Sequence, residues 1–537
     1  MLFKNKSIME ATRLLKNNGL AIALFSVLLM LPACSLTTQP KSVYTPGTFF
    51  KSDYSVLSAL SGVYRNLASN IGMGPSYRLE EVTTDEEMVL AKIQGWWYSP
   101  HFLTLEEHTW ASGQPYIYDT WNGYFNLVGQ ANALIASLQK SSVPKASLKG
   151  PIAELRSLRA IAYFHLMDLF GNVPVFTAPK VDPNNLPKQN TRNQVFDFVV
   201  KELSEAAQDL PSQNDVGSSY YGRLTKEADW SYLAIVYLNA KVYTGTAQYG
   251  KAIAYSDSVI NSGAYHLAAN YFDNFAPDNQ NCPETIFAAV EDPNQPGGIG
   301  TPFVLKTMSG ISGGLFGLPY TPQDGFSTRL SIKNLYEDQD VRKKMFLGYG
   351  PLVNPQNGDT VKVEKVVPDG NSTLYKKGVS TQGPTVYNII KPTGLTKQPM
   401  NAGILWLKWQ VDPNTNGGSA GNDFQYVRYA DILLIKAEAL LRSGGSQSEA
   451  LDLVNQVRER SNATPLKTLT LDNILNERAR ELCFEMVRRR DLIRFGKFTD
   501  AWQFKPKDDG AFRDLFPIPH DAIVANPNLK QNPGYQP

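Results

Sequence analysis

The feature that most constrains the fold is a pair of segments with helical periodicity on either side of a turn-rich segment. Apolar residues recur every three or four positions between about residues 116 and 271 and again between about 424 and 500, a spacing that places them on one face of a helix. Residues 272–423 are rich in Gly, Pro, Asn and Asp and hold only short β-like runs, such as 285–290 and 360–367. A single loop of that length is uncommon in a compact protein. We therefore predict a mostly α-helical frame that carries a loop-rich lobe with short strands.

Several helix boundaries can be placed from the residues that start and stop helices. Pro151 suits the first turn of a helix over 151–170, because proline needs no helical hydrogen bond there. Thr191 is expected to cap a helix that stops at Pro211, since a threonine hydroxyl can accept from the free amides of the first turn. The other helices predicted in the first periodic segment cover 124–138, 225–243 and 249–261.

The second periodic segment predicts a helical hairpin. Helices over 429–442 and 448–460 are joined by Gly444-Gly445, a tight turn of the kind found in tetratricopeptide-like stacks. A single long helix is expected to follow, from Leu471 to about Arg494.

The N-terminus carries the features of an export signal. Basic residues up to Lys16 precede an apolar run over 20–33, which spans about 21 Å as a helix and is too short to cross a bilayer. The run ends in Leu31-Pro32-Ala33-Cys34, which resembles a bacterial lipobox, although a secreted protein with an incidental cysteine is the alternative. We expect residues 1–33 to be a lipoprotein signal peptide and Cys34 to carry acyl chains such as palmitate. Residues 34–537 would then form one tethered body, with the lobe contributed by about 70–115 and 272–423.

Composition excludes several classes of function. The 52 Lys and Arg residues nearly balance the 50 Asp and Glu residues, so no basic excess favours nucleic acid. Three cysteines in 537 residues exclude a disulfide-stapled scaffold. The five histidines show no paired ligand spacing and no phosphate-binding glycine loop occurs, so neither a metal nor a cofactor is expected.

No catalytic arrangement is predicted either. Two G-x-S-x-G matches, at 310–314 and 417–421, lie in turn-rich sequence without the strand and helix that a nucleophilic serine requires. The adjacent carboxylates Asp85, Glu86 and Glu87 cannot flank a sugar at the separation that glycoside hydrolysis needs. We therefore expect a protein that is not an enzyme.

Charged and reactive side chains in the periodic segments are interpreted as structural. Glu477, Glu481 and Glu485 precede a basic cluster. Carboxylates of this helix reach Arg480, Arg488 and Arg489 at spacings of three and four positions, which favours ion pairs along a packed helix. His165 is expected to be a hydrogen-bonded core residue, and Cys282 and Cys483 to be buried thiols.

Short motifs spread along the chain resemble one family. They begin at Cys34 and continue in the same order and at the same spacing to the C-terminus. They are Thr48-Phe49-Phe50, Ala59-Leu60-Ser61-Gly62-Val63-Tyr64, Arg159-Ala160, Leu169-Phe170-Gly171-Asn172-Val173-Pro174, Gly222-Arg223-Leu224-Thr225-Lys226, Arg428-Tyr429-Ala430-Asp431, Lys436-Ala437-Glu438-Ala439, Asn455-Gln456-Val457-Arg458, Glu477-Arg478-Ala479-Arg480-Glu481-Leu482, Arg489-Arg490-Asp491-Leu492-Ile493-Arg494, Pro517-Ile518-Pro519 and Asn532-Pro533-Gly534-Tyr535. The chain resembles the SusD/RagB family of nutrient-binding lipoproteins.

The resemblance implies a fold, a location and partners. Members have tetratricopeptide-like helix pairs that carry a variable binding lobe. They sit on a SusC-like TonB-dependent transporter in the outer membrane and capture glycans, or in some cases peptides, for import. By this resemblance the protein faces the cell exterior, is held by Cys34 and delivers an oligosaccharide to the transporter. Peptide capture, or a surface glycan hydrolase or esterase, are the alternatives.

The candidate ligand contacts are aromatic residues in the lobe. Trp96-Trp97-Tyr98, with Trp110 further on, follow an acidic stretch that contains Asp85. Aromatic rings cover the apolar face of a sugar and carboxylates bind its hydroxyl groups, although each ring could instead bury its segment against the helices. As a group we expect them to form a binding arc with Asp85 as a polar partner. Phe316 and Tyr320 in a Gly-rich loop are second candidates, and Trp406 and Trp409 are third.

Overall fold

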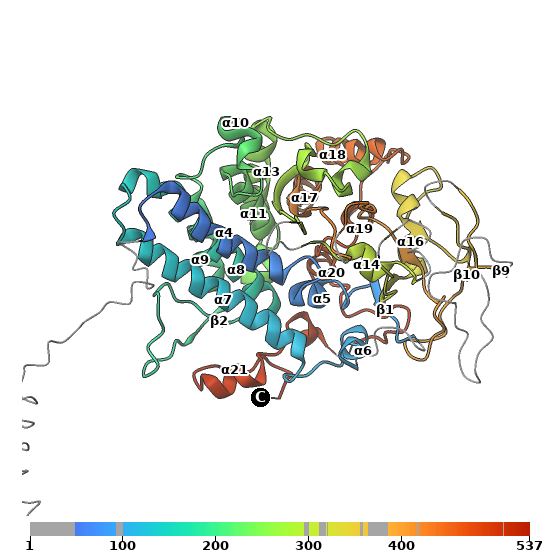
Figure 1. Ribbon diagram of the computed structural model, residues 1–537, viewed down its shortest axis with the longest axis horizontal. Helices are drawn as coiled ribbons and strands as arrows, with labels where there is room; N and C mark the ends of the chain where they lie inside the picture. Colours follow the sequence, from blue (N-terminus) through green and yellow to red (C-terminus); the bar gives the residue numbers. More distant parts are fainter. Residues whose placement is uncertain are drawn as a thin grey trace, which may run out of the picture.

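A computed structural model describes residues 49–92, 100–294, 300–310, 318, 320–354, 358–363, 385–415, 418–508 and 510–536. Its long helices pack in series, each against the next (Figure 1). The first of them are α4 (Asp53–Asn70), α7 (Pro115–Gln139), α8 (Lys145–Phe170), α9 (Arg192–Ala206), α11 (Lys226–Leu238) and α13 (Tyr249–Asn261). The later ones are α17 (Tyr429–Ser443), α18 (Gln447–Arg460), α19 (Leu471–Leu482) and α20 (Arg488–Arg494).

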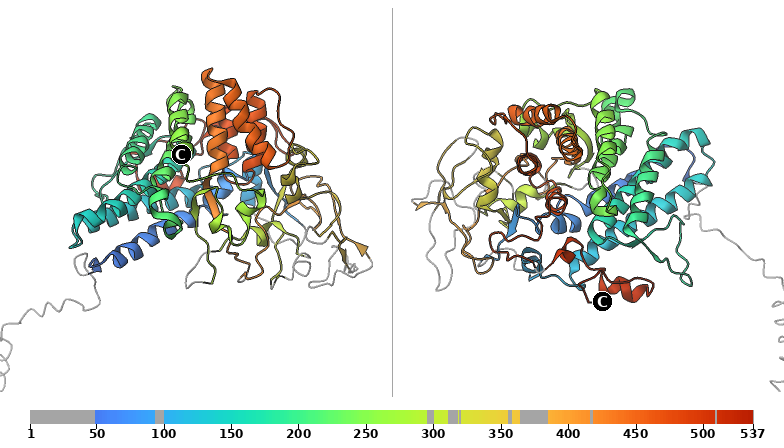
Figure 2. Two further views of the ribbon diagram at one scale, coloured as in Figure 1. Left: turned by 90° about the horizontal axis from the view of Figure 1, so that it is seen from above. Right: turned by 180° about the vertical axis from the view of Figure 1, so that it is seen from behind.

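The two helical segments form one frame because α13 packs directly against α17. Figure 2 shows the green helices of the first segment beside the orange helices of the second. Everything between α13 and α17 in the chain is therefore inserted into a continuous helical stack. This mostly α-helical architecture confirms the predicted fold class, whereas the predicted division into frame and lobe boundaries stays a prediction.

The remaining helices are short. They are α5 (Pro75–Glu80), α6 (Pro100–Glu106), α10 (Gln213–Val216), α12 (Ala240–Thr244), α14 (Phe303–Thr307), α16 (Leu330–Lys333) and α21 (His520–Ala525). The 3-10 helices are η1 (Gly217–Tyr220), η2 (Tyr271–Phe275), η3 (Asn279–Asn281), η4 (Val341–Met345) and η5 (Ala511–Asp514). No helix of the described part is both long enough and apolar enough to cross a bilayer.

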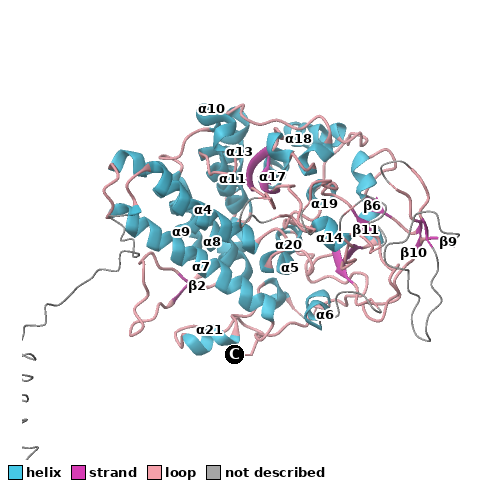
Figure 3. Ribbon diagram, viewed as in Figure 1, coloured by secondary structure: helices cyan, strands magenta, loops and turns pink. Residues whose placement is uncertain are grey.

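The strands form antiparallel pairs (Figure 3). These pairs are β1 (Glu87–Val89) with β5 (Phe326–Thr328), β2 (Val173–Pro174) with β3 (Gln189–Asn190), β4 (Thr285–Ala289) with β12 (Phe424–Arg428), β6 (Phe346–Leu347) with β11 (Leu405–Trp406), β7 (Gly350–Pro351) with β10 (Asn388–Ile389), and β8 (Lys362–Val363) with β9 (Thr385–Val386). β1 lies between α4 and α7 in the chain and β5 lies in the inserted segment, so the pair joins two distant parts of the sequence.

The expected cap at Thr191 is confirmed, and the expected helix start at Pro151 is wrong. Thr191 accepts from the Gln194 amide while the Gln194 side chain accepts in return, which satisfies two free donors. α8 begins at Lys145, so Pro151 lies inside the helix. The preceding two turns form because Leu148 is buried in the same core as the rest of α8, and tertiary packing outweighs the local cost of the proline.

The single helix predicted from Leu471 to about Arg494 is also wrong, because it breaks between α19 and α20. Phe484 and Met486 adopt the left-handed region, with φ of 66° and 60°, which ends a helix. The Phe484 amide donates to Glu86 Oε2 over 3.1 Å and the Met486 amide donates to Glu81. Two buried carboxylates from a distant segment therefore hold the amides that a continuous helix would have used.

The predicted ion pairs within that helix are only partly found. Glu477 pairs with Arg480 at 2.7 Å as expected. Glu485, which stands three positions before Arg488, instead binds Arg428 and Lys408, at 2.8 and 2.6 Å, because the helix ends at Leu482. His165 is a buried residue that bonds Glu80 over 3.2 Å, as predicted. Cys483 is buried as predicted, whereas Cys282 is only partly buried.

Candidate functional site

The two loops that carry the aromatic candidates leave the same end of the β1–β5 ladder. Val89 is paired with Phe326 in antiparallel register, so the C-terminal end of β1 lies beside the N-terminal end of β5. The segment with Trp96, Trp97 and Tyr98 follows β1, and the segment with Phe316 and Tyr320 precedes β5. The fold therefore places the roots of both segments side by side.

A buried ion pair ties these roots together. Lys92 Nζ lies 2.5 Å from Asp324 Oδ1, and each side chain is 1% exposed. Lys92 directly precedes residues 93–99, and Asp324 follows Tyr320 by four positions. The Asp324 amide donates to Met308 O over 3.0 Å, which anchors the same point to the end of α14. Burial raises the pKa of Asp324 to about 6, against the opposing effect of Lys92.

Hydrogen-bonding side chains lie next to these roots. Lys306 of α14 donates to Gln323 Oε1 over 2.6 Å. Burial and the charge of Arg78 together lower the pKa of Lys306 to about 8. The Arg78 guanidinium lies 4.6 Å from the centre of the Tyr116 ring, and all four side chains are partly exposed. This rim combines cationic donors with an amide and an aromatic face, groups that can bind the hydroxyl groups and apolar face of a sugar.

The sequence candidates fall at different places relative to this rim. Trp96, Trp97, Tyr98, Phe316 and Cys34 lie outside the described residues. Tyr320 is described and partly exposed. Its pKa is raised to about 12, first by burial and then by the charge of Asp412, against a hydrogen bond with Thr415.

The expectation that Trp110 faces a ligand is corrected by its burial. Its side chain is 2% exposed, and its indole N–H donates to Tyr535 Oη over 2.8 Å. The ring packs 4.8 Å from Phe516 and 5.4 Å from the Arg513 guanidinium. Because its indole N–H is bonded to Tyr535 and its ring is covered by Phe516 and Arg513, Trp110 is a core residue that packs against the C-terminal segment.

Asp85 is likewise corrected, because its carboxylate is already bound. Arg488 donates to Asp85 Oδ1 and Oδ2, each over 2.7 Å. This bidentate pair lowers the pKa of Asp85 despite burial, and leaves little of the carboxylate for sugar hydroxyls. Asp85 therefore joins the lobe to α20.

The third candidates, Trp406 and Trp409, are also core residues. They are 0% and 1% exposed, and they stack on Phe484 and Phe303 with ring centres 4.0 and 3.8 Å apart. Trp406 lies in β11, where it is packed inside the protein.

Sequence reasoning missed the ion pair and the polar rim. Lys92 and Asp324 are 232 positions apart, so no local pattern links them.

Comparison with known proteins identifies the family. Residues 234–535 match the sequence model of the SusD family, and residues 49–238 match a second model described as "Starch-binding associating with outer membrane". The chain belongs to the SusD family. Starch-binding protein SusD of Bacteroides thetaiotaomicron is 30% identical over 417 residues, which is 72% of each chain. SusD-like protein P2 of Formosa agariphila is 25% identical, over 96% of this chain and 99% of its own.

Solved structures share the same fold. Surface glycan-binding protein A from B. thetaiotaomicron in complex with laminarihexaose has a TM-score of 0.68 and 21% identity, and the match covers 89% of this chain and 99% of that one. A laminarin binding SusD-like protein has a TM-score of 0.69 and 20% identity, over 90% of this chain and 100% of its own. At these identities the likeness shows that the chain shares the mostly helical fold of these proteins.

Proposed function

We propose that this SusD-family chain binds an oligosaccharide at the cell surface and delivers it to a SusC-like TonB-dependent transporter. The observation that carries the proposal is the shared origin of two aromatic-bearing loops at one end of the β1–β5 ladder. Relatives named for starch binding and laminarin binding support a glycan as the ligand.

The proposed contacts are Trp96, Trp97, Tyr98, Phe316 and Tyr320. Their rings would stack on sugar faces while the rim of Arg78, Lys306 and Gln323 binds hydroxyl groups. Stacking on an exposed arc buries little surface, so we expect an affinity per site of about µM to mM. The transporter would add further contacts when it closes over the ligand.

Binding without catalysis agrees with the burial of Glu86 and Glu87, the two carboxyl groups that follow Asp85. Glu86 and Glu87 are 1% and 0% exposed, and burial raises the pKa of Glu86 to about 8. Glycoside hydrolysis requires two carboxyl groups that face the substrate, and these face the protein interior. The proposed activity is therefore capture and not cleavage.

The proposed location rests on the N-terminal sequence and on the family. Acylation of Cys34 after removal of residues 1–33 would hold the body at the outer membrane. The second matched family description, which names association with the outer membrane, supports this placement. Exposure on the outer face, beside the transporter, follows from the proposed role in uptake.

The test is affinity electrophoresis of the chain from residue 35 onward against a panel of polysaccharides that includes starch and laminarin. We expect one polysaccharide to retard the protein, and the Trp96→Ala/Trp97→Ala variant to migrate freely in the same gel. The matched control is Tyr118→Ala on α7, an exposed aromatic residue outside the lobe, which should keep full retardation.

Other outcomes redirect or overturn the proposal. Retardation that survives the tryptophan variant, but is lost in Phe316→Ala/Tyr320→Ala, moves the site to the second loop. Absence of retardation by every polysaccharide contradicts glycan binding and leaves peptide capture to be tested. Release of reducing sugar during the assay contradicts the proposal that the protein is not an enzyme.

A further inference from the structure

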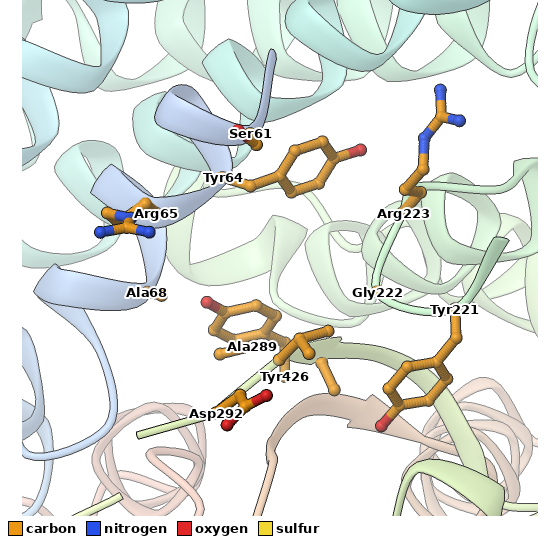
Figure 4. A pocket seen from close by; sticks show the side chains of 12 residues that line it. Ser61, Tyr64, Arg65, Ala68, Tyr221, Gly222, Arg223, Ala289, Asp292 and Tyr426 are labelled. Atoms are coloured by element: carbon orange, nitrogen blue, oxygen red, sulfur yellow. The ribbon is translucent and has the colours of Figure 1, made fainter. Parts of the chain in front are cut away.

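A hollow lies where the helical frame meets the β4–β12 ladder (Figure 4). Neither Lys92 nor Asp324 of the loop roots lines it. It has a volume of about 300 Å³ and is bounded by α4, by the turn after η1 and by the end of β4. The residues that line it are Ser61, Tyr64, Arg65, Ala68, Tyr221, Gly222, Arg223, Ala288, Ala289, Val290, Asp292 and Tyr426. This volume is at the small end of ligand pockets, which suits one ring and not an extended chain.

Aromatic rings from three elements surround the hollow. Tyr64 comes from α4, Tyr221 from the turn, and Tyr426 from β12. The Tyr64 hydroxyl donates to Glu154 Oε2 over 2.5 Å, and the Tyr221 hydroxyl donates to Asp423 Oδ2 over 2.7 Å. Both hydroxyl groups are bonded to carboxylates of the protein, so Tyr64 and Tyr221 present their rings to the hollow.

The rings are held in place from behind and from the side. Phe287 of β4 lies beneath two of them, with ring centres 6.2 Å from Tyr64 and 4.8 Å from Tyr426. The Leu224 amide donates to Tyr64 Oη over 2.9 Å, so Tyr64 is also bonded to the chain that follows the turn. A platform fixed in this way loses little entropy when a ligand stacks on it.

The turn itself is pressed against the end of β4. Gly222 has φ of +77°, and a Cβ at this position would lie 2.2 Å from Val290 Cγ2. Arg223 next to it is fixed by Glu154, with Nε 3.1 Å from Oε2, and lies 3.9 Å above the Tyr220 ring. The Gly222-Arg223 motif, which the loop site leaves unexplained, thus builds one wall of the hollow.

Polar groups stand at the rim. Ser61 and Arg65 project from the exposed face of α4, and Asp292 lies across the opening from them. Asp292 Oδ1 accepts from the Asn294 amide over 3.0 Å, which orients its carboxylate. The edge of the hollow therefore carries the charges of Arg65 and Asp292 and the hydroxyl of Ser61, while its walls are aromatic. These groups match a neutral ligand that has hydroxyl groups around an apolar face.

We infer that this hollow binds a single neutral pyranose ring, as a second carbohydrate site separate from the loop site. The ring would stack its C–H face on the tyrosines, and its hydroxyl groups would bond Asp292, Ser61 and Arg65. The site is independent of the aromatic loops, so it exists whether or not those loops bind glycan.

The test is saturation-transfer NMR on the chain from residue 35 onward, which keeps every described residue. The probes are the methyl glycosides of glucose, galactose, mannose and xylose. All measurements use the Trp96→Ala/Trp97→Ala background, which removes the tryptophan contacts proposed for the loop site. We expect saturation transfer to at least one glycoside, with mM affinity as befits one ring.

Substitutions at the rim locate the signal. Ser61→Trp fills the opening from an exposed position and should reduce the signal at least fivefold. Ser69→Trp, also exposed on α4 but absent from the lining, should leave it unchanged. Asp292→Asn keeps an oxygen for the Asn294 amide and should weaken binding severalfold, with an unchanged melting temperature as evidence of intact folding.

Two results would overturn the inference. One is the absence of transfer to all four glycosides in the tryptophan background. The other is a signal that survives both Ser61→Trp and Asp292→Asn. Loss of polysaccharide retardation in the tryptophan variant does not bear on this site, so failure of the proposed function and failure of this inference are separate outcomes.

Discussion

Lys92 Nζ lies 2.5 Å from Asp324 Oδ1 in a pair that is almost closed to solvent. The two residues stand at the roots of the loops that carry Trp96-Trp97-Tyr98 and Tyr320. A buried ion pair adds little net stability relative to apolar residues of the same shape, but the loss of one partner leaves an uncompensated charge. The pair therefore holds Lys92 and Asp324, and with them the roots of the two segments, together.

Lys92→Met should destabilise the protein and weaken glycan binding together. At pH 8 the unpaired Asp324 carboxylate should cost about 3–5 kcal/mol of unfolding free energy. At pH 5 the cost should be smaller, because the pKa of Asp324 is already raised to about 6 with the lysine present and rises further without it. Urea unfolding at the two pH values and affinity electrophoresis measure both effects.

The matched control for this substitution is Lys92→Met/Asp324→Asn. Asparagine tolerates the φ of +54° at position 324 and removes the buried charge, so the double variant should recover most of the lost stability at pH 8. A single variant as stable as the parent at pH 8 would contradict the role of the pair.

The buried carboxylates at the break between α19 and α20 should make stability fall as pH rises. Burial raises the pKa of Glu86 from 4.5 to about 8, and raises that of Glu81 and Glu87 well above the usual range. The folded protein therefore holds protons that the unfolded chain has released, and the free energy of unfolding decreases with pH between those limits.

Glu86→Gln isolates one of these groups, since glutamine resembles the protonated acid and can still accept from the Phe484 amide. Between pH 6 and 8 the variant should gain stability relative to the parent by up to about 1.4 kcal/mol per pH unit. Unfolding midpoints in urea at intervals of half a pH unit measure the gain. Glu459→Gln, at an exposed position on α18, serves as control, and equal pH dependence of all three proteins would refute the explanation.

Arg428 should be among the residues on which the frame most depends. Its guanidinium contacts Glu481, Glu485 and Glu284 at 2.6, 2.8 and 3.1 Å, and the side chain is 1% exposed. Arg428→Met leaves Glu481 and Glu284 with Arg460, and Glu485 with Lys408. The buried cluster then lacks one positive charge, which should cost about 3–5 kcal/mol or prevent folding. Lys497→Met is the comparison, because its pair with Asp472 is largely exposed and should cost less than about 1 kcal/mol. Thermal unfolding of both variants distinguishes a structural network from a surface charge.

Local patterns predicted the helices well where local chemistry decides them. The capping box at Thr191 and the glycine turn after α17 depend on neighbouring residues, and both are found. α19 ends early for a non-local reason, because Glu81 and Glu86 supply acceptors from about 400 positions away. α4 was not predicted at all, although Ser52 and Ser55 form a capping box at its start.

The ligand contacts were harder to predict than the helices, because burial of a side chain depends on residues that are distant in the sequence. A tryptophan or an aspartate in a turn-rich segment has the same sequence character whether it faces solvent or the core. Trp110 is buried because Phe516 and Tyr535 return to it from the C-terminus, and Asp85 is bound because α20 presents Arg488. Only the tertiary partners separate these residues from a free binding surface.

Gly222 offers a last test, which separates backbone strain from steric contact. Gly222 and Gly245 both have φ of +77°, but a Cβ at Gly222 would lie 2.2 Å from Val290 Cγ2, whereas a Cβ at Gly245 would have no neighbour within 4 Å. Gly245→Ala should therefore cost only the backbone term, about 1 kcal/mol. Gly222→Ala should cost about 1–3 kcal/mol more through overpacking, and should displace the Tyr221 wall of the hollow. Adding Val290→Ala should remove the extra cost, since it deletes the contacting methyl groups. Unfolding free energies of these variants test the argument, and equal costs for the two glycine substitutions would show that the turn is not held against β4 by this contact.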